Sequence, residues 1–132
     1  KALINNGRVY STDVCLPISK ITECVNFAEE QTKKFGLRAP MVGHLGDGNF
    51  HVLLPYDPNQ KETYRKIRDF SDLLIQKTLE LNGTITGEHG VGLHKKTYLI
   101  KEHGDNIPLM QSIKKTIDQN NIMNPGKIFD LN

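Results

Sequence analysis

The first third of the chain changes from a two-residue to a helical spacing of apolar positions. Residues 9–18 carry β-branched and alternating apolar side chains up to Pro17, a pattern that predicts a strand. Residues 19–35 follow as a predicted helix, with Ser19 as its N-cap and Gly36 directly after its last turn. The apolar face of this helix is formed by Ile21, Cys24, Val25 and Ala28.

The middle of the chain predicts a hairpin and then a long helix. Residues 40–55 hold two apolar segments around Gly46-Asp47-Gly48, and Asp-Gly between such segments indicates a β-hairpin. For the helix, Asp57 is the expected cap, Pro58 suits its first position, and Asn82-Gly83 ends it. Its expected buried side consists of Tyr64, Ile67, Phe70, Leu74, Thr78 and Leu81.

The remaining residues predict one more strand and one more helix. Residues 84–86 are a short predicted strand that leads into a glycine-rich loop at 87–92, and a last helix is expected to start near 106–108. The order β-α-β-β-α-β-α favours one α+β domain over residues 1–132. We expect a mainly antiparallel sheet of ferredoxin-like type, with helices on one face and a C-terminal helix in addition.

Composition excludes several classes of protein. The 132 residues include 17 basic and 15 acidic side chains, with a net charge of +2, and basic residues alternate with acidic ones, so no nucleic-acid partner is indicated. The two cysteines do not make a disulfide framework. No apolar stretch approaches the roughly 18 residues of a transmembrane helix.

His44 and His51 are the first candidate site residues. On one straight strand their spacing would send them to opposite faces, whereas a hairpin with a two-residue loop sets them directly opposite each other. A four-residue loop over residues 45–48 makes them diagonal neighbours, and a three-residue loop separates them. Two close imidazoles suit a divalent metal, but spacing alone leaves open a pair of partly buried structural histidines. Asp47 is interpreted as a turn former.

Glu88 and His89 form the second candidate site, between glycines in GEHGVG at residues 87–92. The glycine spacing differs from that of a dinucleotide-binding fold. Adjacent residues of an extended loop point in different directions, so the carboxylate and the imidazole are expected to have separate roles. A metal ligand beside a general base is one reading, and a glycine-rich turn with two exposed polar residues is the other.

Four segments resemble the C-terminal domain of the FAD-linked oxidase family, which includes D-lactate and D-2-hydroxyglutarate dehydrogenases and the glycolate oxidase flavoprotein subunit. They are DVCLP at 13–17, GHLGDGNFH at 43–51, GEHGVG at 87–92 and NPGK at 124–127. The resemblance covers nearly the whole chain. It implies an oxidoreductase that converts a 2-hydroxyacid to a 2-oxoacid by hydride transfer to FAD, and then to an electron acceptor.

The resemblance also implies site residues. It implies a divalent metal, zinc by preference, on His44, His51 and Glu88, although such a set also accepts iron or manganese. It implies His89 as the general base and Asn49 as a substrate-binding residue. Asn124 and Lys127 are implied as residues that contact FAD.

The FAD-binding domain that accompanies this domain in the family is not among these 132 residues. The chain by itself is therefore expected to be catalytically incomplete, with its own N-terminal FAD-binding domain as a partner. The implied location is the cytoplasm, the periphery of an inner membrane, or the mitochondrion in a eukaryote. The alternative function is a non-catalytic metal-binding or interaction domain that uses the same hairpin.

Overall fold

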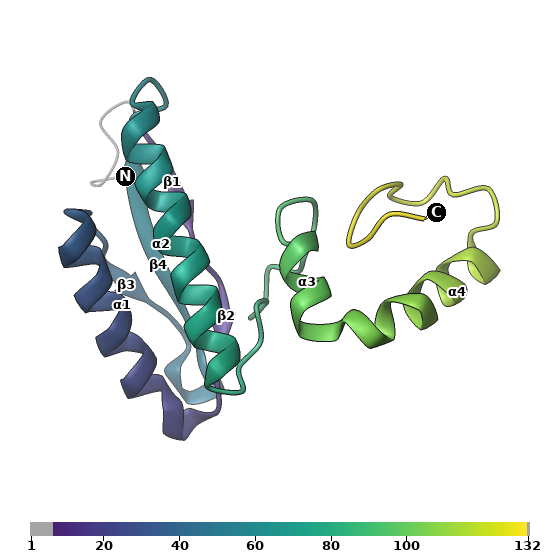
Figure 1. Cartoon of the computed structure of the whole chain (residues 1–132), viewed down its shortest axis with the longest axis horizontal. Helices are drawn as coiled ribbons and strands as arrows, with labels where there is room; N and C mark the ends of the chain where they lie inside the picture. The colour runs from purple at the N-terminus through teal and green to yellow at the C-terminus, as the bar shows by residue number, and fades with distance from the viewer. Residues whose placement is uncertain (1–6, 132) are drawn as a thin grey trace. The chain divides into compact units, whose positions relative to one another are not determined.

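A computed structural model describes residues 7–131, which divide into two compact units that meet in the chain between Glu88 and His89 (Figure 1). The first unit contains the sheet and two long helices. The second contains two shorter helices and the C-terminal segment. Within residues 7–131, no helix has the length and apolar character that a membrane crossing requires.

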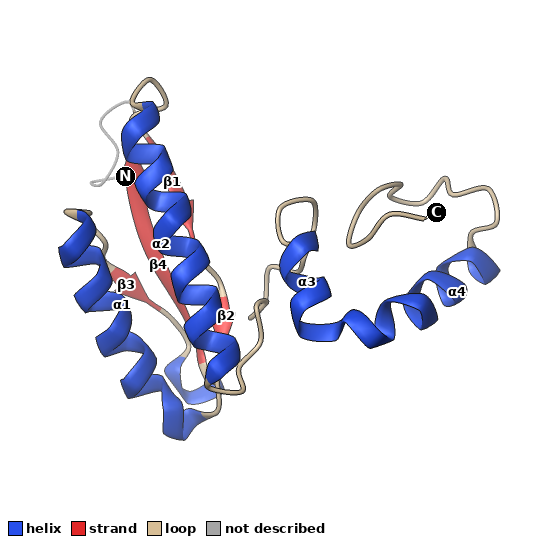
Figure 2. Cartoon of the chain, viewed as in Figure 1, coloured by secondary structure: helices blue, strands red, loops and turns tan. Residues whose placement is uncertain are grey.

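The sheet of the first unit is built around one long strand, β4 (Asn49–Tyr56) (Figure 2). The strands β1 (Arg8–Ser11) and β2 (Val14–Cys15) pair with it in antiparallel register, one after the other along the same edge. The short strand β3 (Met41–Val42) pairs antiparallel with the opposite edge. The predicted strand over 9–18 is therefore present, but it is interrupted at residues 12 and 13.

One face of the sheet carries the hydrophobic core. Phe50, Val52 and Leu54 alternate along β4 and are each at most 1% exposed. The helices α1 (Ile21–Phe35) and α2 (Lys61–Glu80) cover this face (Figure 2). Side chains alternate across a strand, so the residues between these three face away from the helices. The predicted α+β class and its helices on one face are confirmed.

The end of α1 is as predicted, but its start is not. Gly36 adopts a left-handed φ of 66°, and the N–H groups of Gly36 and Leu37 bond back to Lys33 and Thr32. This pair of backbone hydrogen bonds is typical of a helix end at which glycine follows the last turn. Ser19 is not the N-cap, because it lies inside a 3-10 turn, η1 (Ile18–Lys20), that precedes the helix.

The helix α2 buries most of its predicted side but begins later than expected. Asp57 is not its cap, since the Asp57 carboxylate accepts the N–H of Asn59 inside a separate turn, and the helix starts at Lys61. Five of the six predicted positions are buried, whereas Tyr64 is 39% exposed. The Tyr64 ring instead lies against Tyr56, with 5.3 Å between ring centroids.

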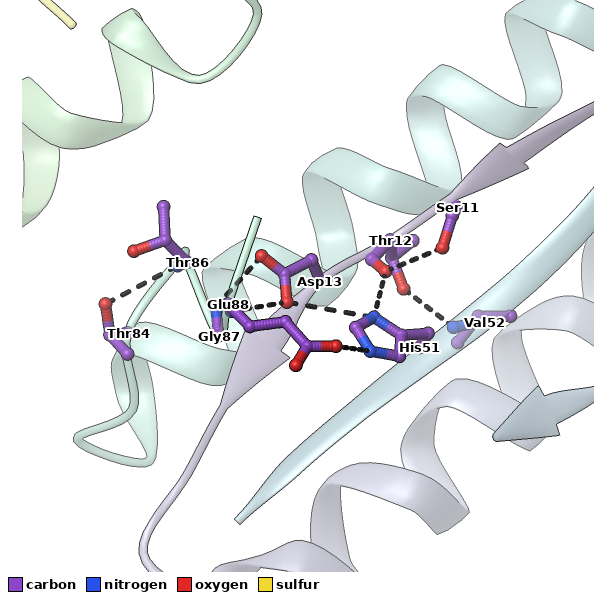
Figure 3. Close-up of polar contacts among 9 residues, drawn as sticks. All are labelled: Ser11, Thr12, Asp13, His51, Val52, Thr84, Thr86, Gly87 and Glu88. Atoms are coloured by element: carbon purple, nitrogen blue, oxygen red, sulfur yellow. Dashed lines mark hydrogen bonds and ion pairs between the residues drawn. The ribbon is translucent and has the colours of Figure 1, made fainter. Parts of the chain in front are cut away.

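The segment after α2 adds almost no strand. The predicted strand over 84–86 is reduced to a single bridge between Thr84 and Cys15, whose backbone groups exchange two hydrogen bonds of 2.8 and 3.2 Å. This bridge attaches the segment to the free edge of β2. The chain then turns back over the face of the sheet that the helices leave uncovered (Figure 3).

The second unit begins with a helix that the sequence pattern did not predict, α3 (Lys96–His103). A 3-10 turn, η3 (Gly104–Asn106), joins it to the predicted last helix, α4 (Ile107–Ile117). The C-terminal segment folds back on these helices. The Lys96 ammonium donates to the Asp130 carboxylate at 2.6 Å, and the Gln111 amide donates to the Asp130 carbonyl at 2.7 Å.

Candidate functional site

The candidate site lies on the helix-free face of the sheet, where polar side chains are buried. Asn49 and His51 alternate with the core residues of β4 and are 5% and 7% exposed. Asp13, in the interruption between β1 and β2, is 2% exposed. Buried polar side chains of this kind need hydrogen-bond partners. Most of those partners come from Thr12 and from the segment that ends at Glu88 (Figure 3).

Thr12 replaces one hydrogen bond of the sheet with a bond from its side chain. The register sets Thr12 opposite Val52, and the Thr12 N–H donates to the Val52 carbonyl at 3.1 Å. The Val52 N–H donates to the Thr12 hydroxyl at 2.9 Å. In a regular antiparallel pair that N–H would bond to the Thr12 carbonyl. The Thr12 carbonyl is thus released from the ladder.

The released carbonyl orients His51. It lies 2.8 Å from His51 Nδ1, and because a carbonyl oxygen can only accept, Nδ1 carries a proton and donates it. The other ring nitrogen, Nε2, lies 3.0 Å from Glu88 Oε1 (Figure 3). In a neutral imidazole, Nε2 then presents a lone pair toward a carboxylate. Two electron-rich atoms can approach each other this closely when a proton or a metal ion lies between them.

Asp13 holds the backbone from which the Glu88 side chain extends. One carboxylate oxygen accepts the Gly87 N–H at 3.0 Å, and the other accepts the Glu88 N–H at 3.1 Å. Gly87 is required here because a Cβ at this position would lie 2.3 Å from Asn49 Oδ1 and 2.5 Å from Asp13 Oδ1. The absent side chain lets the loop approach the sheet closely.

The hairpin that carries His44 and His51, called the histidine hairpin below, has a four-residue loop. This is one of the two even-length loops that bring these residues close together. Val42 pairs with His51, and the His44 carbonyl accepts the N–H groups of Asp47 and Asn49. Residues 45–48 form the loop, which contains a 3-10 turn, η2 (Leu45–Asp47), and ends on Gly48 with a left-handed φ of 82°. His44 is therefore the diagonal neighbour of His51 and not its direct partner. Its side chain is exposed.

Asn49 carries an unsatisfied acceptor. Its Oδ1 is buried and has no hydrogen-bond partner among the described residues. An unpaired buried oxygen of this type costs about 1–3 kcal/mol, which a bound donor would offset. The orphaned oxygen lies beside Gly87, and therefore next to the His51 and Glu88 pair.

The structure brings together only part of the predicted set. His51 and Glu88 are in contact, Asn49 lies beside the same loop, and His44 is on the adjoining hairpin turn. His89 directly follows Glu88 in the chain and is exposed. Asn124 and Lys127 are exposed residues of the second unit. Asn124 has a left-handed φ of 49°, and its carbonyl accepts the Lys127 N–H at 3.3 Å.

Thr12 and Asp13 were not predicted as site residues. The sequence did hold a signal, since the polar run Ser11-Thr12-Asp13 interrupts an otherwise apolar strand pattern. Their partners, however, lie 39 to 75 positions further along the chain. A pattern within one element does not reveal them.

Three comparisons identify relatives of the chain. Residues 2–128 match the family model described as FAD linked oxidases, C-terminal domain. The chain is 39% identical over 131 residues to a probable mitochondrial D-lactate dehydrogenase of Danio rerio, covering 98% of this chain and 26% of that protein. It is 36% identical over 118 residues to the glycolate oxidase subunit GlcD of Bacillus subtilis, covering 89% of this chain and 25% of that protein.

Among solved structures, a 4-ethylphenol oxidase from Gulosibacter chungangensis, in complex with isoeugenol, matches with a TM-score of 0.61 and 21% identity. The match covers 94% of this chain and 25% of that one. At this identity the likeness concerns the fold alone. The chain thus spans about a quarter of the length of the proteins that it matches.

Proposed function

The chain belongs to the family of FAD linked oxidases, C-terminal domain, and on that premise we propose that it is the metal- and substrate-binding part of a flavin-dependent 2-hydroxyacid dehydrogenase. The substrate class follows from the relatives, whose names include D-lactate, glycolate and D-2-hydroxyglutarate. All three compounds carry a hydroxyl on the carbon next to a carboxylate. The proposed product is the corresponding 2-oxoacid.

The observation that carries the proposal is the arrangement of His51. Its Nδ1–H is held by the Thr12 carbonyl, and its Nε2 faces the Glu88 carboxylate at 3.0 Å. Histidines that bind metals usually donate their other ring N–H to a carbonyl or a carboxylate, which is the arrangement of His51. The pair therefore fits a divalent cation as a nitrogen and an oxygen ligand.

In the proposed site, His44, His51 and Glu88 hold the metal. When bound, the metal would lower the pKa of the substrate hydroxyl, and FAD would supply the acceptor for the hydride. The orphaned Asn49 Oδ1 is available to accept a hydrogen bond from the substrate. His89 follows Glu88 directly in the chain, and we assign it the removal of the hydroxyl proton, a role for which an imidazole is suited near neutral pH.

FAD is proposed to bind mainly outside these residues. Asn124 and Lys127 are exposed, and their amide and ammonium groups suit contacts to the polar parts of a flavin nucleotide. The electron acceptor is a further partner of the proposed enzyme. Relatives named as mitochondrial support the mitochondrion as the proposed location. The alternative is the cytoplasm or the periphery of an inner membrane, and cell fractionation separates these locations.

Metal content tests the ligand set. We expect the intact protein, after incubation with zinc, iron or manganese and gel filtration, to retain about one ion per chain. His44→Ala and His51→Ala should each lose it, because each removes one proposed ligand. His94→Ala is the matched control, since His94 is also an exposed histidine but lies outside the proposed set. Unchanged metal content in both ligand variants would contradict the proposal.

Turnover tests the reaction. The full gene product with FAD should reduce an artificial dye in the presence of D-lactate, glycolate or D-2-hydroxyglutarate, and His89→Ala should reduce kcat at least 100-fold. Metal binding without turnover of any of the three acids would favour a non-catalytic metal-binding domain instead. If the protein neither binds metal nor turns over any of the three acids, both the dehydrogenase and the metal-binding domain are rejected.

A further inference from the structure

We propose that Thr12 and Asp13 are positioning residues of the site: Thr12 sets which nitrogen of His51 faces the metal, and Asp13 sets where the Glu88 side chain starts. This inference rests on the proposed function, since it concerns the same metal site. Both residues lie in the two-residue interruption between β1 and β2.

The interruption is not a change of register. The pairing of β1 with β4 continues unchanged into the pairing of β2 with β4, so residues 12 and 13 remain opposite Val52 and His51. What changes is one hydrogen bond. The Val52 N–H turns to the Thr12 hydroxyl at 2.9 Å, and the Thr12 carbonyl, which would otherwise receive it, accepts from His51 Nδ1 at 2.8 Å.

This exchange determines the tautomer of His51. A neutral imidazole has a single N–H, for which the Thr12 carbonyl competes with the Glu88 carboxylate. The Thr12 carbonyl is fixed by the sheet, whereas the Glu88 side chain is 47% exposed and can be solvated. The proton therefore stays on Nδ1, and Nε2 is left with a lone pair for a metal ion.

Asp13 performs the equivalent task for Glu88. Its two oxygens accept two consecutive backbone N–H groups, at 3.0 and 3.1 Å. A carboxylate is suited to this because it offers acceptors at both oxygens, whereas an asparagine in the same position would direct an NH₂ group at one of the two donors. The same carboxylate lies 3.7 Å from His51 Nδ1, so it also favours a proton on that nitrogen.

The two residues thus connect segments that are far apart in sequence. His51 is on the central strand and Glu88 is at the end of the segment after α2, yet both are oriented from one pair of adjacent residues. Partners of metal ligands that do not touch the metal typically contribute 10- to 100-fold to metal affinity. Loss of either residue should therefore weaken metal binding, although neither belongs to the proposed ligand set of His44, His51 and Glu88.

The test uses Zn²⁺ and Co²⁺ affinity of the intact protein. Thr12→Val keeps the shape of the side chain but removes the acceptor for the Val52 N–H, which then competes with His51 for the carbonyl. We expect about 10- to 100-fold weaker binding. Thr12→Ser keeps the hydroxyl and should restore the affinity to within about threefold of wild type. Asp13→Asn should weaken binding in the same range, whereas Thr63→Val, at a half-buried position of α2 where the hydroxyl donates to Gln60, should not.

A second readout needs no metal. In ¹⁵N-labelled metal-free protein at alkaline pH, long-range proton–nitrogen correlations report which nitrogen of His51 is protonated. We expect Nδ1–H in wild type and in Thr12→Ser, and a shift toward Nε2–H in Thr12→Val. Urea denaturation measures the stability of each variant. If Thr12→Ser binds metal as weakly as Thr12→Val, the loss of affinity is merely structural and does not depend on the hydroxyl.

The outcomes are distinguishable. If wild type binds neither Zn²⁺ nor Co²⁺, the proposed function fails, while the tautomer measurement still tests the role of Thr12. If wild type binds metal but Thr12→Val and Asp13→Asn bind equally well, the positioning roles are overturned. If Thr12→Val does not fold, the metal affinity of Asp13→Asn and the His51 tautomer of wild type test the positioning roles. An Nε2–H tautomer in wild type rejects the inference.

Discussion

At the scale of single residues, the site is a set of buried polar groups that complete one another. Thr12, Asp13, Asn49 and His51 are each at most 7% exposed, although side chains of these types usually lie at surfaces. The backbone groups and side chains of neighbouring segments satisfy Thr12, Asp13 and His51. Asn49 Oδ1 is the exception, and it lies where the substrate is proposed to bind.

Gly87 gives a direct test of this packing. In Gly87→Ala the new methyl group would lie 2.3 Å from Asn49 Oδ1 and 2.5 Å from Asp13 Oδ1, so the loop must move away from the sheet. We expect a loss of about 1–3 kcal/mol in the free energy of unfolding, as for other overpacked positions. Because Glu88 moves with the loop, zinc affinity should fall at least tenfold, measured by competition with a chelating dye.

Gly46→Ala is the matched control for Gly87→Ala. Gly46 lies in the histidine hairpin, but nothing stands within 4 Å of a Cβ placed on it. Stability and zinc affinity should therefore stay near wild type. Equal effects of the two substitutions would mean that the close approach at Gly87 does not determine the position of Glu88.

Sequence reasoning recovered the chemistry-bearing residues better than their supports. His51 and Glu88 were predicted, and the structure brings them into contact. Their association depended on the resemblance, because nothing in the spacing alone joins residues 37 positions apart. Thr12 and Asp13 act through contacts of the folded sheet. Such contacts leave only an interruption of the strand pattern as a signal.

At the scale of secondary structure elements, the odd or even length of a loop and the spacing of apolar residues were informative where an element has one buried face. The even-length loop of the hairpin and the buried sides of α1 and α2 are confirmed for this reason. The helix α3 was missed because its two buried residues, Tyr98 and Leu99, are adjacent and give no repeat at helical spacing. The start of α1 was wrong because a 3-10 turn precedes it.

The turn that follows α4 depends on a single carboxylate, that of Asp118. Its oxygens accept the N–H groups of Ile122 and Met123, and Lys114 forms an ion pair with it. The hydrogen bond from Lys114, assisted by those from the backbone, holds the pKa of Asp118 below its usual range. A carboxylate with a lowered pKa stabilises the fold while it is charged.

This turn should therefore open in acid. Its stabilisation is complete above the ordinary aspartate pKa of about 3.9 and is lost as the pH falls from there through the lowered pKa of the folded protein. We expect the Ile122 and Met123 amides to lose protection from hydrogen exchange, once rates are corrected for the intrinsic effect of pH. Asp118→Asn should show low protection already at pH 7.

Asp105→Asn serves as the comparison for Asp118→Asn, because Asp105 is an exposed aspartate of the same unit. At pH 7 and in acid, Asp105→Asn should show the same protection of the Ile122 and Met123 amides as wild type. If Asp118→Asn kept full protection of these amides at pH 7, the carboxylate would not be what closes the turn.

At the scale of the whole molecule, the hydrophobic core is distributed unevenly between the two units. The first unit buries Phe50, Phe70 and Leu74 almost completely. In the described part of the second unit, from His89 to Leu131, only Tyr98 and Leu99 are buried hydrophobic residues. The helix α4 buries none of its side chains, and its apolar positions Leu109, Ile113 and Ile117 are 53–71% exposed.

Local stability follows the number of buried apolar contacts, so the two units should open with different free energies. Native-state hydrogen exchange of the chain should show amides of β4, α1 and α2 that exchange only on global unfolding, and α4 amides that exchange much earlier. Phe70→Ala should cost about 3–5 kcal/mol in the first unit, whereas Ile117→Ala should change little. Equal protection of α4 and β4 would contradict this, because it would require the second unit to be stabilised by something other than its own core.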